Sequence, residues 1–90
     1  MRDDGLEWHD DKAAINFRDH GVTFETARAA FDDPDHFEVD DPDPHEVRFN
    51  RGCRYETDIF VVTYTERGDR IRIISARPAT RHEQRLYFGQ

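Results

Sequence analysis

The chain has 90 residues, of which 36% are hydrophobic and 37% are charged, and its formal net charge is −7. A chain of this length folds as one domain, residues 1–90, and its seven Phe, three Tyr and one Trp argue against disorder. No apolar run approaches the roughly 18 residues of a membrane span, and the residues at Met1 do not resemble a signal peptide, so we expect a cytoplasmic protein.

A single cysteine, Cys53, excludes an internal disulfide and a cysteine-based metal site. Cys53 falls in a predicted strand with no sequence cue for a paired base. We therefore interpret it as a half-buried thiol rather than a nucleophile.

The charge is divided unequally between the two halves of the chain. Residues 1–46 hold 15 acidic and 4 basic side chains, whereas residues 47–90 hold 5 acidic and 9 basic ones. Charges farther apart than about 8–10 Å are largely screened, so the local field decides what binds. The basic half is therefore expected to bind phosphate, while the acidic half keeps the protein soluble or meets a basic partner. The bias of a GC-rich or salt-adapted host would equally explain the excess of Arg and Asp.

A first helix is predicted through residues 12–18. Asp10 or Asp11 is expected to cap it, and Gly21 is a natural stop after its last turn. Two aromatic residues near this helix are assigned to the core: Trp8 and Phe17.

A second helix is predicted over residues 24–31, with Thr23 as its cap. Four apolar residues at helical spacing should form its buried stripe: Phe24, Ala27, Ala30 and Phe31. The following segment, residues 32–46, is rich in Asp, Pro and His and is predicted to be a loop with a short edge strand at 36–40. Its carboxylates lack the glycine of a calcium loop, which favours a solvated loop.

Three longer strands follow, at residues 47–54, 59–65 and 70–77, with a turn at 66–69. In the last strand, simple alternation places two sets of residues on opposite faces: Arg70, Arg72, Ile74 and Ala76 on one, and Ile71, Ile73, Ser75 and Arg77 on the other. Thr80 and Glu83 then form the capping box of a C-terminal helix, with Leu86 and Phe88 as its docking residues. The prediction is an α+β domain with two N-terminal helices, an antiparallel sheet of three to four strands and a C-terminal helix.

The sequence contains no P-loop, dinucleotide glycine motif, zinc spacing or nucleophile elbow. Arg, His, Glu and Tyr remain, and they suffice to cleave RNA by attack of its own 2′-hydroxyl on the adjacent phosphate. In that reaction the protein orients the substrate, neutralises charge on the phosphate and moves protons. No metal ion or cofactor is expected.

The order and spacing of several motifs resemble the BrnT toxin family over nearly the whole chain. These motifs are Trp8-x-Asp10-x-Lys12 with Asn16, His20-Gly21-Val22-x-Phe24-x-x-Ala27, Phe31-x-Asp33-Pro34, Arg48-Phe49, Tyr64-Thr65-Glu66-Arg67-Gly68, and Arg72-Ile73-Ile74-Ser75-Ala76-Arg77-x-Ala79-Thr80-x-x-Glu83 with Tyr87. The resemblance implies a RelE-like fold and a ribonuclease toxin of a type II toxin–antitoxin pair. It also implies neutralisation by a ribbon-helix-helix antitoxin, BrnA, in a hetero-oligomer that reaches operator DNA only through the antitoxin.

The resemblance, together with the arginine-rich segment 63–87, indicates the site residues. The residues expected to bind RNA are Arg48, Arg67, Arg70, Arg72, Arg81 and Lys12. The residues expected to act in catalysis are Arg77, Glu83, Tyr87 and His20, with Arg77 clamping the phosphate and one of the other three moving protons.

Each nominated residue also has a structural interpretation. Arg77 is equally suited to an ion pair with Glu83, which the capping box already explains. His20 suits the negative end of a helix dipole, and Tyr87 suits the core with its hydroxyl at the rim. Lys12 is typical of a solvated helix face. Arg70 and Arg72 resemble the charges that protect a sheet edge.

Two functional hypotheses therefore stand. The first is an endoribonuclease toxin that cleaves RNA and inhibits translation. The second is a non-catalytic module whose acidic N-terminal half docks a basic partner while its arginines form surface ion pairs.

Overall fold

A computed structural model describes residues 2–3 and 5–89, with side chains from Gly5 onward. These residues form three helices and a mixed sheet. The helices are α1 (Asp10–His20), α2 (Phe24–Phe31) and α3 (Arg81–Phe88). The strands are β1 (Arg2–Asp3), β2 (Leu6–Glu7), β3 (Phe37–Asp40), β4 (Phe49–Tyr55), β5 (Asp58–Arg67) and β6 (Arg70–Pro78). No helix of the described residues is long and apolar enough to cross a membrane.

The sheet has the strand order β1-β2-β6-β5-β4-β3. The four longer strands, β3 to β6, pair antiparallel as the sequence predicts. The two-residue strands β1 and β2 were not predicted, because so short a strand carries no periodicity. β2 pairs parallel with β6, and the adjoining Ile71 N–H donates to the Gly5 carbonyl at 2.7 Å. The α+β class is confirmed, and the sheet is mixed rather than purely antiparallel.

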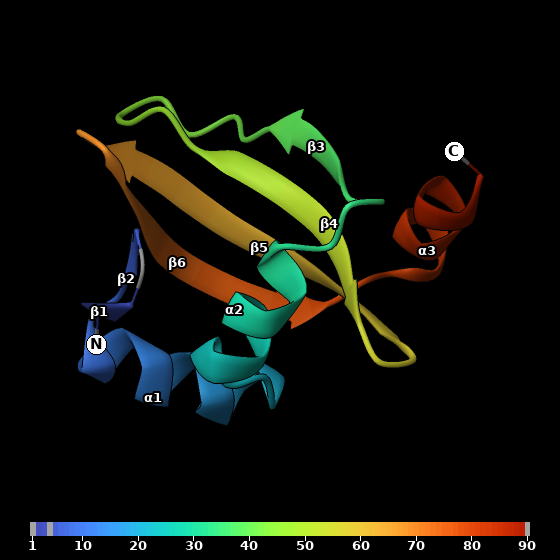
Figure 1. Ribbon diagram of the computed structural model, residues 1–90, viewed down its shortest axis with the longest axis horizontal. Helices are drawn as coiled ribbons and strands as arrows, with labels where there is room; N and C mark the ends of the chain where they lie inside the picture. The colour runs from blue at the N-terminus through green and yellow to red at the C-terminus, as the bar shows by residue number, and fades with distance from the viewer. Residues whose placement is uncertain (1, 4, 90) are drawn as a thin grey trace.

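The larger core lies between the sheet and the two N-terminal helices (Figure 1). The predicted stripe of α2 is buried there, and Thr23 caps this helix by accepting the Thr26 N–H at 3.1 Å. A smaller cluster joins Ile59, Val61, Ala79 and Tyr87. Because Val61 and Val62 are consecutive in β5 and belong to different clusters, the smaller cluster lies on the other face of the sheet.

Three expectations about the helices are wrong. The residue before α1 is His9, and it makes no side-chain capping bond; Asp10 and Asp11 instead lie in the first turn, where the helix dipole favours them. Phe17 is 55% exposed, because α1 turns Asn16 toward the sheet. In α3 the docking residue is Tyr87, and two residues predicted to dock are exposed: Leu86 and Phe88.

A β-bulge in β6 overturns the alternation predicted for this strand. Ser75 pairs with Thr63 and Ile73 pairs with Tyr64, so Ile74 is an extra residue without a partner in β5. The bulge moves Ala76 to the core face beside Ile73, where both are buried. As a consequence, Ser75 and Arg77 share the opposite face with Arg72, whereas strict alternation had separated Arg72 from Arg77.

Candidate functional site

The candidate site is the sheet face that α1 and α2 leave open. The bulge aligns three polar side chains of β6 on this face: Arg72, Ser75 and Arg77. The partners of Arg72 and Arg77 in β5 are Thr65 and Val61, four residues apart. At about 3.3 Å per residue, the two arginines lie roughly 13 Å apart along the sheet, a span that fits a short stretch of nucleic-acid backbone. Thr63 of β5 is the cross-strand neighbour of Ser75.

Arg77 and Glu83 form a bidentate ion pair where β6 leads into α3. Arg77 Nη1 donates to Glu83 Oε1 at 2.7 Å, and Arg77 Nη2 donates to Glu83 Oε2 at 2.9 Å. Glu83 also accepts the Thr80 N–H at 2.8 Å, which completes the predicted capping box. The hydrogen bonds from Arg77 lower the pKa of Glu83 to about 2, and the same pairing raises the pKa of Arg77. Glu83 is therefore ionised and a weak base at neutral pH.

Glu7 of β2 holds two arginines of β6 at the other end of the open face. Its Oε1 accepts from Arg70 Nε at 2.9 Å, and its Oε2 accepts from Arg72 Nη2 at 2.8 Å. The hydrogen bond from Arg72, reinforced by Arg70, lowers the pKa of Glu7. Arg72 Nη1 also lies 3.3 Å from His9 Nε2. Glu7 therefore fixes the orientation of both guanidinium groups and neutralises part of their positive charge.

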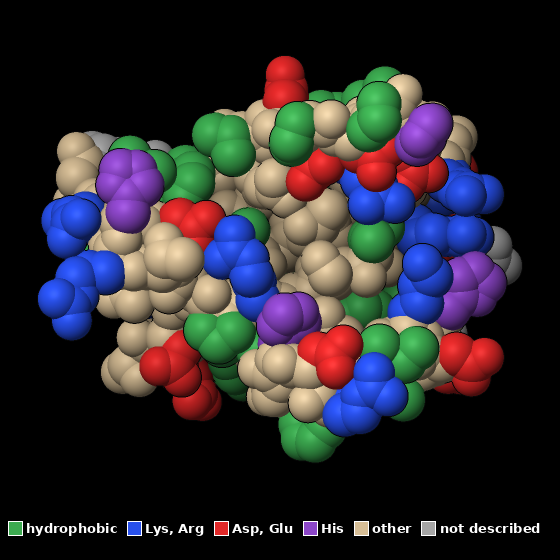
Figure 2. Space-filling view, turned by 180° about the vertical axis from the view of Figure 1, so that it is seen from behind, with side chains coloured by type: hydrophobic (Ala, Val, Ile, Leu, Met, Phe, Trp, Pro, Cys, Tyr) green, Lys and Arg blue, Asp and Glu red, His purple; other side chains and the backbone are tan. Residues whose placement is uncertain are grey.

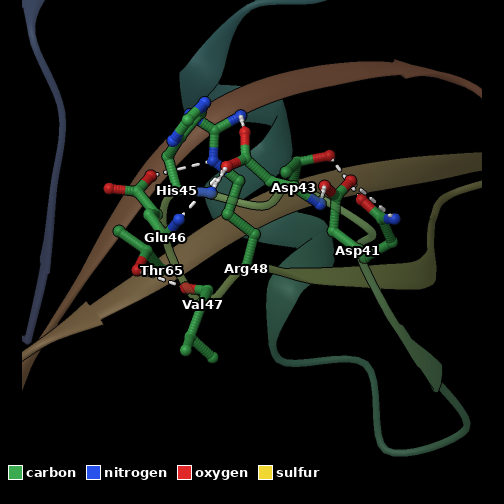
Figure 3. A network of polar contacts seen from close by, with 9 residues as sticks. Asp41, Asp43, His45, Glu46, Val47, Arg48 and Thr65 are labelled. Atoms are coloured by element: carbon green, nitrogen blue, oxygen red, sulfur yellow. Dashed lines mark hydrogen bonds and ion pairs between the residues drawn. The ribbon is translucent and has the colours of Figure 1, made fainter.

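Arg48 belongs to a polar network in the acidic loop after β3 (Figure 3). Its Nε donates to Glu46 Oε1 at 2.8 Å, and its Nη1 lies 3.4 Å from Asp43 Oδ2. These contacts raise the pKa of Arg48, with the Glu46 hydrogen bond as the largest cause. The same loop is tied to the sheet by the Thr65 hydroxyl, which donates to the Val47 carbonyl at 2.7 Å.

The surroundings of Tyr87 make its hydroxyl poorly suited to proton transfer. Its side chain is buried in the smaller cluster, and its hydroxyl donates to Asp33 Oδ2 at 2.6 Å. Burial, followed by the hydrogen bond to Asp33, raises the pKa of Tyr87 to about 12. This position matches the structural interpretation of a core tyrosine whose hydroxyl lies at the rim.

Two site residues predicted from the sequence lie on α1, beside the edge of β6. Among the described residues this edge is free beyond Arg72, because β2 pairs only with Ile71 and Arg72. His20 and Lys12 are exposed and line a hollow of about 290 Å³ together with Ser75. Asn16 forms the link to the strand: its Nδ2 donates to the Ala76 carbonyl at 2.8 Å, and its Oδ1 accepts the Ala76 N–H at 3.0 Å. The structure therefore brings these two residues close to the strand segment that carries Arg77.

Arg67 and Arg81 are both exposed: Arg67 is the last residue of β5, and Arg81 is the first residue of α3. Neither has a carboxylate within ion-pair distance among the described residues. On the face seen from behind Figure 1, Lys and Arg side chains gather at two opposite sides with carboxylates interspersed (Figure 2). The positive charge is therefore not one continuous surface.

Arg51 is a structural arginine that we did not nominate. Its guanidinium carbon lies 3.9 Å above the ring centre of Phe31, and its Nη1 donates to the Phe31 carbonyl at 2.8 Å. Arg51 also contacts Glu38, which accepts a hydrogen bond from the Tyr64 hydroxyl. The alternation of the strand is the signal for this role, because it places Arg51 on the same face as the partly buried Phe49.

Comparison with protein families gives a match over most of the chain. A family model described as the ribonuclease toxin BrnT of type II toxin–antitoxin systems matches residues 8–83. No curated protein matches the chain in sequence. Within residues 2–3 and 5–89, no group of three or more His, Cys, Asp or Glu side chains is placed to hold a metal ion.

Proposed function

The chain belongs to the BrnT family of type II ribonuclease toxins, and from this premise we propose that it is an endoribonuclease that cleaves RNA by 2′-hydroxyl attack without a metal ion. We further propose that cleavage inhibits translation and that a ribbon-helix-helix antitoxin neutralises the toxin. The observation that carries the proposal is the alignment of Arg72, Ser75 and Arg77 on the open face of the sheet.

Arg77 is the proposed phosphate clamp. A guanidinium has five N–H donors, and the side chain of Arg77 is 39% exposed. Donors of Arg77 therefore remain after its bonds to Glu83 and to the Pro78 carbonyl. Glu83 fixes the plane of the guanidinium and acts as a positioning residue. A guanidinium held in advance stabilises charge that develops on the phosphate without reorganising during the reaction.

His20 is the proposed proton carrier, since His is the side chain that most often serves as a general acid or base in enzymes. It lies with Lys12 beside Ser75 at the free edge of β6, which supports a role for both residues next to a phosphate bound by Arg77. Glu83 and Tyr87 are less suited to this step, because hydrogen bonding holds the pKa of Glu83 near 2 and burial raises the pKa of Tyr87 to about 12.

The proposal is tested by expressing the wild-type chain and the Arg77→Ala variant in cells and measuring growth and bulk RNA integrity. Purified protein is then incubated with RNA in the presence of EDTA. A second substrate carries a 2′-deoxynucleotide at the cleavage position. The matched control is Arg85→Ala, an exposed arginine of α3 with no ion-pair partner among the described residues.

We expect growth arrest and RNA fragmentation by the wild-type chain and by the Arg85→Ala control. Loss of both effects in Arg77→Ala, with its circular dichroism spectrum unchanged, supports the clamp. Cleavage of the 2′-deoxy substrate, or loss of cleavage in EDTA, contradicts the mechanism.

The second candidate function is a binding module without catalysis. It is favoured by the pairing of Arg72 with Glu7 and of Arg77 with Glu83, which removes part of the positive charge from the open face. RNA that stays intact with folded wild-type protein would favour this second function.

A further inference from the structure

The outer edge of β3 is an unpaired edge of the sheet. β3 is the last strand in the sheet order, and among the described residues no other element runs along its outer side (Figure 1). An open edge of this kind presents backbone N–H and C=O groups that another extended chain can pair with. The groups that β3 turns outward therefore determine what this edge can bind.

The register of β3 and β4 identifies these groups. The Asp41 N–H donates to the Arg48 carbonyl at 3.0 Å, so this facing pair lies at a hydrogen-bonded position of the ladder. Hydrogen-bonded and non-hydrogen-bonded pairs alternate along an antiparallel ladder. Val39 facing Asn50 therefore repeats the bonded arrangement, and Glu38 and Asp40 turn their N–H and C=O groups away from β4.

The side chains of β3 alternate as well. Phe37 covers Gly52 on one face, and Val39, which is 51% exposed, follows on that same face. Glu38 lies on the opposite face, where it contacts Arg51. Asp40 shares the face of Glu38 and is exposed, with no ion-pair partner among the described residues.

The sequence around this edge is strongly acidic. Residues 32–46 contain eight carboxylates and no Lys or Arg. A second copy of the chain would place these same charges against one another, so pairing of two β3 edges is disfavoured. A basic strand is the occupant whose charge complements the edge.

We propose that the outer edge of β3 is a docking site for a basic extended segment of the antitoxin, which joins the sheet as an additional strand. This inference rests on the proposed function, because it names the place where the neutralising partner binds. The alternation of β3 predicts the pattern of that segment: Lys or Arg at alternate positions facing Glu38 and Asp40, with an apolar residue between them against Val39.

The test uses the full chain and its antitoxin protein, with binding measured by isothermal titration calorimetry. Asp40→Pro removes one outward N–H and one carboxylate, and it leaves the inward bonds of Val39 in place, since proline is tolerated on strand edges that face solvent. Asp40→Lys reverses the charge but keeps the N–H. The control is Asp19→Lys, which makes the same change of charge at an exposed site on α1.

We expect each Asp40 variant to bind the antitoxin about tenfold more weakly or worse, which corresponds to about 1.4 kcal/mol or more. The control is expected to bind as the wild-type chain does. Raising the salt concentration should weaken wild-type binding more than it weakens binding of Asp40→Lys.

Antitoxin binding that is unchanged in both Asp40 variants overturns the docking site, as does a wild-type chain that binds no antitoxin. Self-association of the wild-type chain that Asp40→Pro abolishes would assign the edge to a second copy and also overturns it. RNA cleavage by the same proteins without antitoxin is measured in parallel. If the wild-type chain cleaves no RNA but the Asp40 variants bind the antitoxin more weakly than it does, the ribonuclease proposal is contradicted and the docking site is supported.

Discussion

The Glu83→Gln variant removes the ion pair with Arg77 and keeps the capping box of α3. The glutamine amide oxygen can still accept the Thr80 N–H, and Gln serves at this position of a capping box as well as Glu does. The substitution therefore keeps the helix cap and removes the charge that the two hydrogen bonds from Arg77 depend on. Any loss of stability then reports the ion pair.

The magnitude follows from the geometry and the exposure of the pair. The two bonds measure 2.7 and 2.9 Å, and the side chains of Arg77 and Glu83 are 39% and 21% exposed. Hydrogen bonds to charged groups contribute about 1.5–3 kcal/mol, whereas solvent-exposed ion pairs contribute roughly 0–1 kcal/mol. For this partly screened pair we expect Glu83→Gln to lower the free energy of unfolding by about 1–2 kcal/mol at pH 7.

The pH dependence gives a second, independent check. The pKa of Glu83 is lowered from 4.5 to about 2, so its stabilising contribution is complete above pH 4.5 and is lost as the pH falls toward 2. Urea unfolding of the wild-type and Glu83→Gln proteins at pH 7 and pH 3 measures the difference. We expect the difference to shrink by roughly half or more at pH 3.

A double-mutant cycle with Arg77→Ala completes the assay, because the Glu83→Gln substitution should cost little once Arg77 is absent. Two results would refute the reasoning. The first is a difference in stability that is the same at pH 3 as at pH 7. The second is a full cost of Glu83→Gln in the Arg77→Ala background.

Two further predictions concern packing around the sheet. Asn16→Ala removes three buried hydrogen bonds to the Val22 and Ala76 backbone, so we expect a loss of about 2–4 kcal/mol in urea unfolding; a loss under 1 kcal/mol would contradict the bridging role. In Gly52→Ala the new Cβ would overlap the Phe37 ring, so we expect a lower melting temperature and a cost of about 1–3 kcal/mol. The double variant with Phe37→Leu should recover part of that cost, and full additivity would argue against the clash.

Local signals in the sequence predict three helix ends correctly but miss the start of α1. Thr23 and Thr80 cap their helices as expected, and Gly21 adopts a left-handed φ of 71° after α1. These features depend on residues within one turn of each other, so the sequence pattern contains them. Which face of a short helix is buried depends instead on distant contacts. For this reason the assignment of Phe17 to the core and of Leu86 to docking is wrong.

In the candidate site, too, the sequence indicates contacts between nearby residues but not contacts between distant ones. The pairing of Arg77 with Glu83 spans six residues and was one of two interpretations open from the sequence. The bond from Arg72 to Glu7 spans 65 residues and depends on the parallel contact of β2 with β6, which no periodicity indicates. The bulge at Ile74 was equally hidden, because β6 has the apolar and polar residues of a regular strand.

The paired arginines have a consequence for how the open face would bind RNA. A phosphate that approaches Arg72 or Arg77 meets a guanidinium whose charge is already shared with Glu7 or Glu83. Because the guanidinium stays paired with its carboxylate, the phosphate contact neutralises less net charge, and fewer counterions are released per contact than at a free arginine. The affinity of the open face should therefore depend only weakly on salt. Selectivity would come from geometry, because the carboxylates hold each guanidinium in one plane.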